Sequence, residues 1–196
     1  MAKRDALREL SRKIPAPREI ERILSGLRDK DDLHTGIIAV SIVEATLEKL
    51  IVTRLKRSDK KFLDRLFQNM GPLSDFNSKI LIGEAFGILT GPLADELHVM
   101  RAIRNAFAHA KVHISFSDAP ISQEVGRLRL IRPIQATKGT FPDGTPIKFD
   151  LPAKTSFLLA TRIVLIIMDE ISKKKSTADK VIARALRLPT RAKPVD

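Results

Sequence analysis

The sequence predicts a mainly α-helical fold, a single helical bundle that carries a small β hairpin or sheet insertion. The chain has 196 residues, 43% of them hydrophobic, which is enough for one domain with a buried core. Apolar residues recur every three or four positions along most of the chain, as they do in helices packed on a core. Residues 112–152 differ, because they are rich in Pro, Gly, Ser and Thr and contain strand-like runs.

The first predicted helix is short and covers residues 17–26, with Pro17 in its first turn. The strongest helix follows at residues 31–57, acidic at its start and basic at its end, as the helix dipole favours. Its middle is apolar almost all round, so we expect it at the centre of the fold. Glu44 lies on the apolar stripe of this helix, and a carboxylate in that position needs a partner.

Two shorter helices are predicted at residues 59–69 and 74–89, and a longer one at about residues 93–110. The last helix, at residues 153–173, is long and apolar. Between these two long helices, the runs VHISF, GRLRLIRPI and PIKFDL resemble strands. They favour a hairpin or small sheet attached to the helical body.

The net charge of +12 lies mainly at the two ends of the chain. Residues 1–28 carry eight basic and four acidic side chains, and residues 173–196 carry eight and two, so the ends hold +4 and +6. We therefore divide the chain into a basic leader with a short helix (1–28), a helical domain (29–173) with its insertion at 112–152, and a basic tail (174–196). Basic tails attract phosphates without reading bases, so RNA and DNA are candidate partners of these tails.

The predicted helix at residues 93–110 holds the candidate site. At about 100° per residue, its apolar side chains face the core. The opposite arc carries five groups able to hold a phosphate or move a proton, namely Arg104, Arg101, Asn105, His98 and His109. Arg104 and His109 lie at opposite edges of this arc, about 140° apart in a regular helix. A joint site therefore needs the helix to end at His109, or a second copy to face it across a two-fold axis.

A purely structural role explains the same residues. The two arginines can pair with Glu44, Glu48 or Asp95, while His109 binds carbonyl groups at the end of the helix. Both interpretations stay open at this stage, and they can hold together if a former catalytic motif has become structural.

Some of these residues carry a resemblance to known families. Residues 104–109, Arg-Asn-Ala-Phe-Ala-His, fit the R-x4-6-H pattern of the HEPN superfamily of all-helical domains. Three stretches are similar to the mannitol-operon repressor family, namely residues 71–80 (GPLSDFNSKI), 85–89 (AFGIL) and 101–109 (RAIRNAFAH). Residues 36–50 also resemble the first long helix of that family. The resemblance covers roughly residues 33–109 and, more loosely, the last helix, and it implies a HEPN-like helical bundle.

The resemblance also implies roles for individual residues. HEPN endoribonucleases are metal-independent and act as dimers in which two motifs line a shared cleft. By that likeness His109 is the general base or acid, Arg104 stabilises charge on the phosphorane, and Asn105 orients His109 or contacts phosphate. The predicted binding residues beside them are Arg101, His98 and Glu44. Other HEPN members are non-catalytic modules that bind nucleic acid or partners, and the mannitol-repressor relatives are named as transcriptional regulators.

Several classes of site are absent from the sequence. The chain has no cysteine, which excludes a disulfide scaffold, a thiol nucleophile and a thiolate metal site. We find no phosphate-binding glycine loop, dinucleotide fingerprint or zinc-binding histidine pair, so we expect no metal and no cofactor. The sequence starts without an apolar signal segment, and its longest apolar run, residues 156–168, is too short to span a bilayer and contains Arg162. We expect a cytoplasmic protein without membrane contact.

These observations favour a regulatory or interaction module that resembles the mannitol repressor, forms a homodimer and binds a protein partner or nucleic acid. The alternative is a metal-independent endoribonuclease, of toxin or RNA-processing type, that uses Arg104 and His109. The regulator is favoured because Glu44 is placed to neutralise Arg104. Direct operator reading is disfavoured, since the polar residues lie near the end of their helix, whereas major-groove contacts are usually made from the start.

Overall fold

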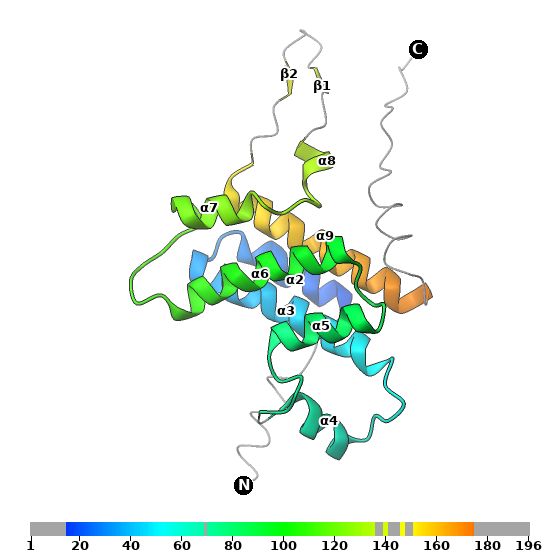
Figure 1. Cartoon of the computed structure of the whole chain (residues 1–196). Coiled ribbons are helices and arrows are strands. Elements are labelled where there is room, and N and C mark those ends of the chain that lie inside the picture. The colour runs from blue at the N-terminus through cyan, green and yellow to red at the C-terminus, as the bar shows by residue number, and fades with distance from the viewer. Residues whose placement is uncertain (1–14, 69, 136–138, 141–145, 148–150, 175–196) are drawn as a thin grey trace, which may run out of the picture.

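The computed structural model describes residues 15–68, 70–135, 139–140, 146–147 and 151–174. Three long helices lie side by side in the body of the molecule (Figure 1), namely α3 (Asp32–Val52), α6 (Gly91–His109) and α9 (Ala153–Lys174). The shorter helices are α2 (Pro17–Leu27), α4 (Lys60–Phe67), α5 (Phe76–Ala85), α7 (Ala119–Val125) and α8 (Arg132–Gln135). The prediction of a mainly α fold is confirmed. The predicted leader up to residue 14 and the tail from residue 175 lie outside the described residues.

Helix α3 is central because its sequence is apolar on almost every side, and it packs against α2, α5, α6 and α9. Asp31 caps its start by accepting a hydrogen bond from the backbone N–H of His34, 2.8 Å away. The predicted extension of this helix to residue 57 is wrong. The chain leaves the helix at Thr53, whose hydroxyl donates to the Leu50 carbonyl at 2.6 Å. Beyond that point most side chains are exposed, so no core face favours a longer helix.

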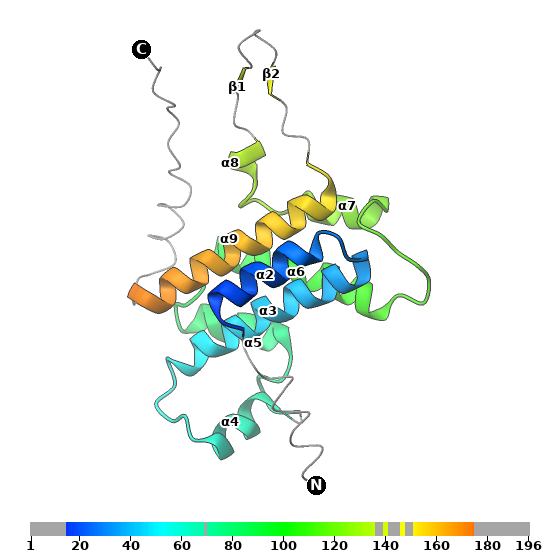
Figure 2. The same cartoon turned by 180° about the vertical axis from the view of Figure 1, so that it is seen from behind.

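Helix α2 lies on the rear face of the body, alongside α3 and α9 (Figure 2). Leu24 and Leu27 of α2 are buried, so this short helix belongs to the packed core. Arg162 of α9 pairs with α2, since its Nη2 lies 2.8 Å from Glu21 Oε1 and donates to Ser25 Oγ at 2.9 Å. The one charge inside the apolar run of residues 156–168 therefore has partners on the neighbouring helix.

Helices α5 and α6 form an adjacent pair, while α4 stands apart at the edge of the body (Figure 1). Asp75 caps α5 by accepting from the Ser78 N–H at 3.0 Å. The helix is shorter than predicted and ends at Ala85, because Gly87 takes a positive φ of 63° and turns the chain. Pro92 sits in the first turn of α6, where the missing N–H leaves no helical bond unmade.

The predicted β insertion at residues 112–152 is wrong. Its first half is loop and helix, since it contains α7 and α8. Within the described residues the only strand pairing is antiparallel and joins two-residue segments, β1 (Gly139–Thr140) and β2 (Pro146–Ile147). A contact of four residues forms no sheet layer on the core, because a stable sheet needs longer strands and more of them.

The run GRLRLIRPI shows why the strand prediction failed. Its side chains alternate as in a strand only over residues 128–130, since Leu128 and Leu130 are buried and Arg129 between them is exposed, but Ile131 is buried as well. Its backbone, however, bonds to a side chain instead of a second strand. The N–H groups of Arg129 and Leu130 both donate to Glu96 Oε1 of α6, the second at 3.2 Å. Alternation reports which face is buried, but a sheet also requires a neighbouring strand.

The core joins α6 to α9 through Phe116, which lies in the loop after α6. Its ring stands 4.9 Å from the ring of Phe107 and 5.1 Å from that of Phe157, and all three side chains are buried. Its backbone N–H donates to Asp32 Oδ2 at 2.8 Å, which fixes the loop to the start of α3. Gly36 of α3 leaves room for Phe107, because a Cβ at that position would lie 2.9 Å from Phe107 Cε2 and closer still to Cδ2.

Candidate functional site

Two of the predicted site residues, Glu44 and Arg104, are in direct contact. Arg104 Nη2 lies 2.9 Å from Glu44 Oε2, and Glu44 Oε1 accepts from Lys79 Nζ at 2.9 Å. Lys79 Nζ also lies 2.8 Å from Glu48 Oε2. These four side chains alternate in charge and connect α3, α5 and α6, and we call them the Glu44 network. The carboxylate that the sequence places on an apolar stripe is thus fully paired.

Lys79 and Glu44 are the least exposed members of the Glu44 network. The side chain of Lys79 is 7% exposed and that of Glu44 is 17% exposed. Burial by itself lowers the pKa of Lys79, but the carboxylates of Glu44 and Glu48 outweigh it, so the pKa is raised above its usual value. The ammonium group stays charged, and the network ties three helices together.

The remaining predicted catalytic residues do not join this network. Asn105 is half-buried, and His109 is exposed at the last residue of α6. The helix stays regular to this end, since the Ala110 N–H donates to the Ala106 carbonyl at 3.0 Å. Arg104 and His109 therefore leave the helix about 140° apart. The contacts found for Arg104 include neither Asn105 nor His109.

The predicted binding residues Arg101 and His98 lie on other parts of α6. Arg101 is half-buried, and its Nε is buried without a hydrogen-bond partner among the described residues. The Nε of Arg104 is likewise buried without a hydrogen-bond partner among the described residues. His98 is half-buried and lines a cavity that faces α7, away from the Glu44 network. The structure thus brings Glu44 and Arg104 together, but it does not bring the six predicted site residues into one site.

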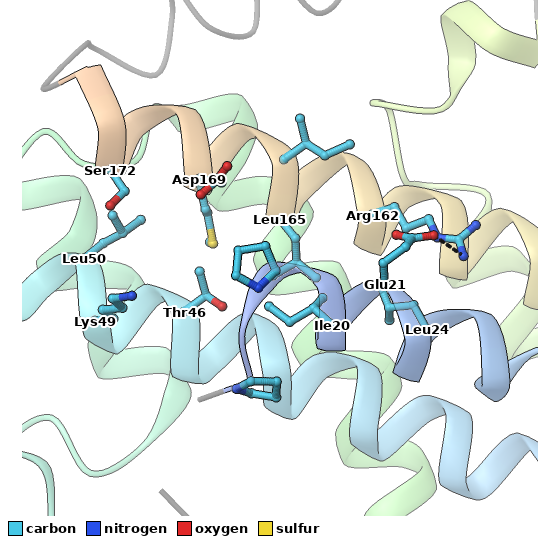
Figure 3. A pocket seen from close by; sticks show the side chains of 14 residues that line it. Ile20, Glu21, Leu24, Thr46, Lys49, Leu50, Arg162, Leu165, Asp169 and Ser172 are labelled. Carbon is cyan, nitrogen blue, oxygen red and sulfur yellow. Dashed lines mark ion pairs between the residues drawn. The ribbon is translucent and has the colours of Figure 1, made fainter. Parts of the chain in front are cut away.

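A second cavity, of about 170 Å³, lies between α2, α3 and α9 (Figure 3). Its apolar lining includes Ile20, Leu24, Leu50 and Leu165. The ion pair of Arg162 with Glu21 is also part of the lining (Figure 3). None of the six predicted site residues lines this cavity.

Sequence reasoning missed two buried charges, Lys79 and Glu96. Counted over the whole residue, they are 5% and 2% exposed. Each stands at a core position of its helix, three residues after a buried apolar side chain, Phe76 and Leu93 respectively. The same signal, a charge on an apolar stripe, singled out Glu44, and applied to α5 and α6 it would have found both residues.

No metal or membrane site is evident in the part of the chain that the structure describes. There, no three His, Asp or Glu side chains converge to hold an ion. Nor is any of the described helices long and apolar enough to cross a bilayer.

Comparison with known proteins finds a likeness in fold. The sequence matches no family model, and no curated protein matches it significantly. Among solved structures, the chain is similar to MtlR in the X-ray structure of the MtlR–HPr complex from Escherichia coli, with a TM-score of 0.51 and 17% sequence identity. The match covers 86% of this chain and 98% of that one. The two chains therefore share a helical fold over nearly the whole length of MtlR.

Proposed function

We propose that this chain is a protein-interaction module with a regulatory role, of the type represented by the mannitol repressor. The observation that carries the proposal is the fold likeness to MtlR, a protein whose structure was solved in complex with HPr. The likeness covers 98% of the MtlR chain and is not confined to one common helical hairpin. For this chain we accordingly propose a protein partner of the HPr kind.

The Glu44 network supports binding over catalysis. An arginine that stabilises a phosphorane must offer its guanidinium group to the incoming phosphate. Arg104 instead donates to Glu44, whose other oxygen is held by Lys79. No observation in the described residues favours the endoribonuclease alternative, because Arg104 is paired with Glu44 and His109 lies exposed at the end of α6.

The experiment is a calorimetric titration of the full chain with HPr from the same source organism. The expected result is saturable binding, with a heat signal that is absent when unfolded HPr or an unrelated protein of similar size and charge is injected. Absence of binding up to about 1 mM, where the binding free energy is only about −4 kcal/mol, would overturn the proposal for this partner.

A parallel assay addresses the nuclease alternative with the same purified protein. Single-stranded and structured RNA are incubated with the chain and with the variants His109→Ala and Arg104→Ala in the presence of a chelator. We expect no cleavage by any of the three proteins. Cleavage by the wild type that leaves cyclic phosphate ends and disappears in His109→Ala would contradict the binding-module proposal.

Homodimer formation and nucleic-acid binding through the tails stay predictions. Residues 1–14 carry five basic and two acidic side chains, and residues 175–196 carry six and two, so these segments hold seven of the twelve net charges. Deleting both spares α2, whose Leu24 and Leu27 are buried. We expect the deletion to reduce the salt dependence of polyanion binding, since log affinity changes by about 0.9 per phosphate contact per log salt. Sedimentation of the full chain measures the dimer.

A further inference from the structure

A cavity of about 340 Å³ lies between α6, α7 and the segment that leads into α8. This volume is at the lower end of the range of about 300–1,000 Å³ that small-molecule sites occupy. Residues 127–132, which we call the arginine segment, contribute Arg127, Arg129 and, at the start of α8, Arg132 to its lining, which also includes His98 and the buried Glu96. We call it the arginine cavity.

Two of the three guanidinium groups, those of Arg129 and Arg132, have N–H donors that no acidic side chain in the described part of the chain accepts. Arg127 Nη1 donates to both oxygens of Glu124 at 3.0 Å, so its charge is matched within α7 and its adjoining turn. Arg129 Nη1 lies 3.7 Å from Asp95 Oδ2, a distance too long for a hydrogen bond. Both side chains are about two-thirds exposed. Arg132 is exposed and, among the described residues, forms no salt bridge or hydrogen bond to an acidic side chain, although its charge lies near Glu96.

Glu96 holds the arginine segment in place. It is 2% exposed, and its Oε1 accepts from the backbone N–H groups of Arg129 and Leu130. The segment is therefore anchored at its middle by a buried group, which orders the backbone that carries the arginines before any ligand arrives. Glu96 Oε2 is buried and has no hydrogen-bond partner in the described part of the chain.

The charge of the cavity depends on Glu96. Burial raises the pKa of Glu96, against the two backbone hydrogen bonds and the nearby Arg129 and Arg132, which lower it. Three carboxylates, those of Asp95, Glu96 and Glu124, line the cavity together with the three arginines and His98. Glu124 is paired with Arg127, while Asp95 lies beyond hydrogen-bond distance of Arg129, so Arg129 and Arg132 keep guanidinium donors for an anion.

We propose that the arginine cavity binds a phosphate group, either inorganic phosphate or a phosphomonoester, between Arg129 and Arg132. A tetrahedral anion with several oxygens can meet two guanidinium forks at once, and such hydrogen bonds are the strong ones. Glu96 is a positioning residue, because it acts through the backbone of the arginine segment. This proposal is independent of the proposed protein partner, since it rests on the lining of the cavity and not on the fold likeness to MtlR.

The test is a calorimetric titration of the full chain with inorganic phosphate and, separately, with phenyl phosphate. The expected result is saturable binding that weakens about tenfold or more in the double variant Arg129→Ala/Arg132→Ala, the loss expected for charge-assisted hydrogen bonds. Both side chains are exposed, so the variant keeps its fold. The matched control Arg22→Ala/Arg28→Ala removes the same charge from exposed positions on and just after α2 and is expected to leave binding unchanged.

The outcomes separate the proposal from its alternatives. Tighter binding of phenyl phosphate identifies a phosphomonoester as the ligand class, and equal or tighter binding of inorganic phosphate identifies the free anion. Glu96→Gln keeps the Oε1 acceptor and is expected to retain binding, whereas a substitution that removes the acceptor, Glu96→Ala, weakens it. Absence of saturable binding, or an equal loss in the control variant, overturns the proposal.

Discussion

Arg104 of α6 donates to Glu44 of α3 at 2.9 Å, which joins two residues 60 positions apart in the sequence. The contact gives a structural partner to the arginine that the R-x4-6-H pattern highlights, because its Nη2 donates to a carboxylate within the fold. Lys79 binds the second oxygen of the same carboxylate, so Glu44 ties α5 and α6 to the central helix. A substitution at Glu44 therefore acts on stability first.

Glu44→Gln is expected to lower the free energy of unfolding by about 2 kcal/mol, because it leaves Arg104 without its charge partner and Lys79 with Glu48 alone. Urea denaturation measures the change. Glu84→Gln on the exposed side of α5 is the matched control and should stay within about 0.5 kcal/mol of the wild type. Equal small effects at both positions would mean that the Glu44 network contributes little to stability.

Gly36→Ala is expected to destabilise the protein by about 1–3 kcal/mol, because the new methyl group would overlap the buried ring of Phe107. Gly26→Ala is the control, since nothing lies within 4 Å of a Cβ at that position of α2. There the better helix propensity of alanine should stabilise the fold by up to about 1 kcal/mol. Thermal denaturation of the two variants should therefore shift in opposite directions, and a common shift would contradict the packing.

Phe116→Ala is expected to cost about 3–5 kcal/mol, because the ring lies buried between Phe107 and Phe157 and its removal leaves a cavity. Phe86→Ala, at the exposed end of α5, serves as the control with a much smaller loss. Chemical denaturation followed by circular dichroism compares the two. A loss at Phe116 no larger than at Phe86 would show that the loop after α6 is not part of the core.

The stability of the protein should depend on pH through Glu96. Burial raises the folded-state pKa of this group above the usual glutamate value of 4.5. A raised folded-state pKa adds stability that is fully present below the unfolded pKa and is lost as pH rises through the folded pKa. The wild type should therefore lose stability relative to Glu96→Gln as pH rises from below 4.5 towards neutrality. Urea denaturation at a series of pH values measures the difference, and a constant difference would mean that Glu96 does not titrate abnormally.

Helix positions followed well from local patterns, and their ends did not. The residue spacing predicts the long helices α3, α6 and α9 because each buries a continuous apolar face. The end of α3 at Val52 was missed, since basic residues beyond it suit a helix dipole as well as they suit a solvated turn. A helix continues where its next turn can bury apolar side chains against the core, and this depends on the neighbouring elements.

The sequence by itself determined the helical class, the central place of α3 and the need of Glu44 for a partner, because hydrophobic spacing and a charge on an apolar stripe are local facts. Only the tertiary structure decided that Arg104 and Lys79 are the partners, and that Glu96 bonds the backbone of Arg129 where a strand was expected. These contacts join residues from distant parts of the chain. Their distances depend on how the helices pack, and no local pattern encodes that packing.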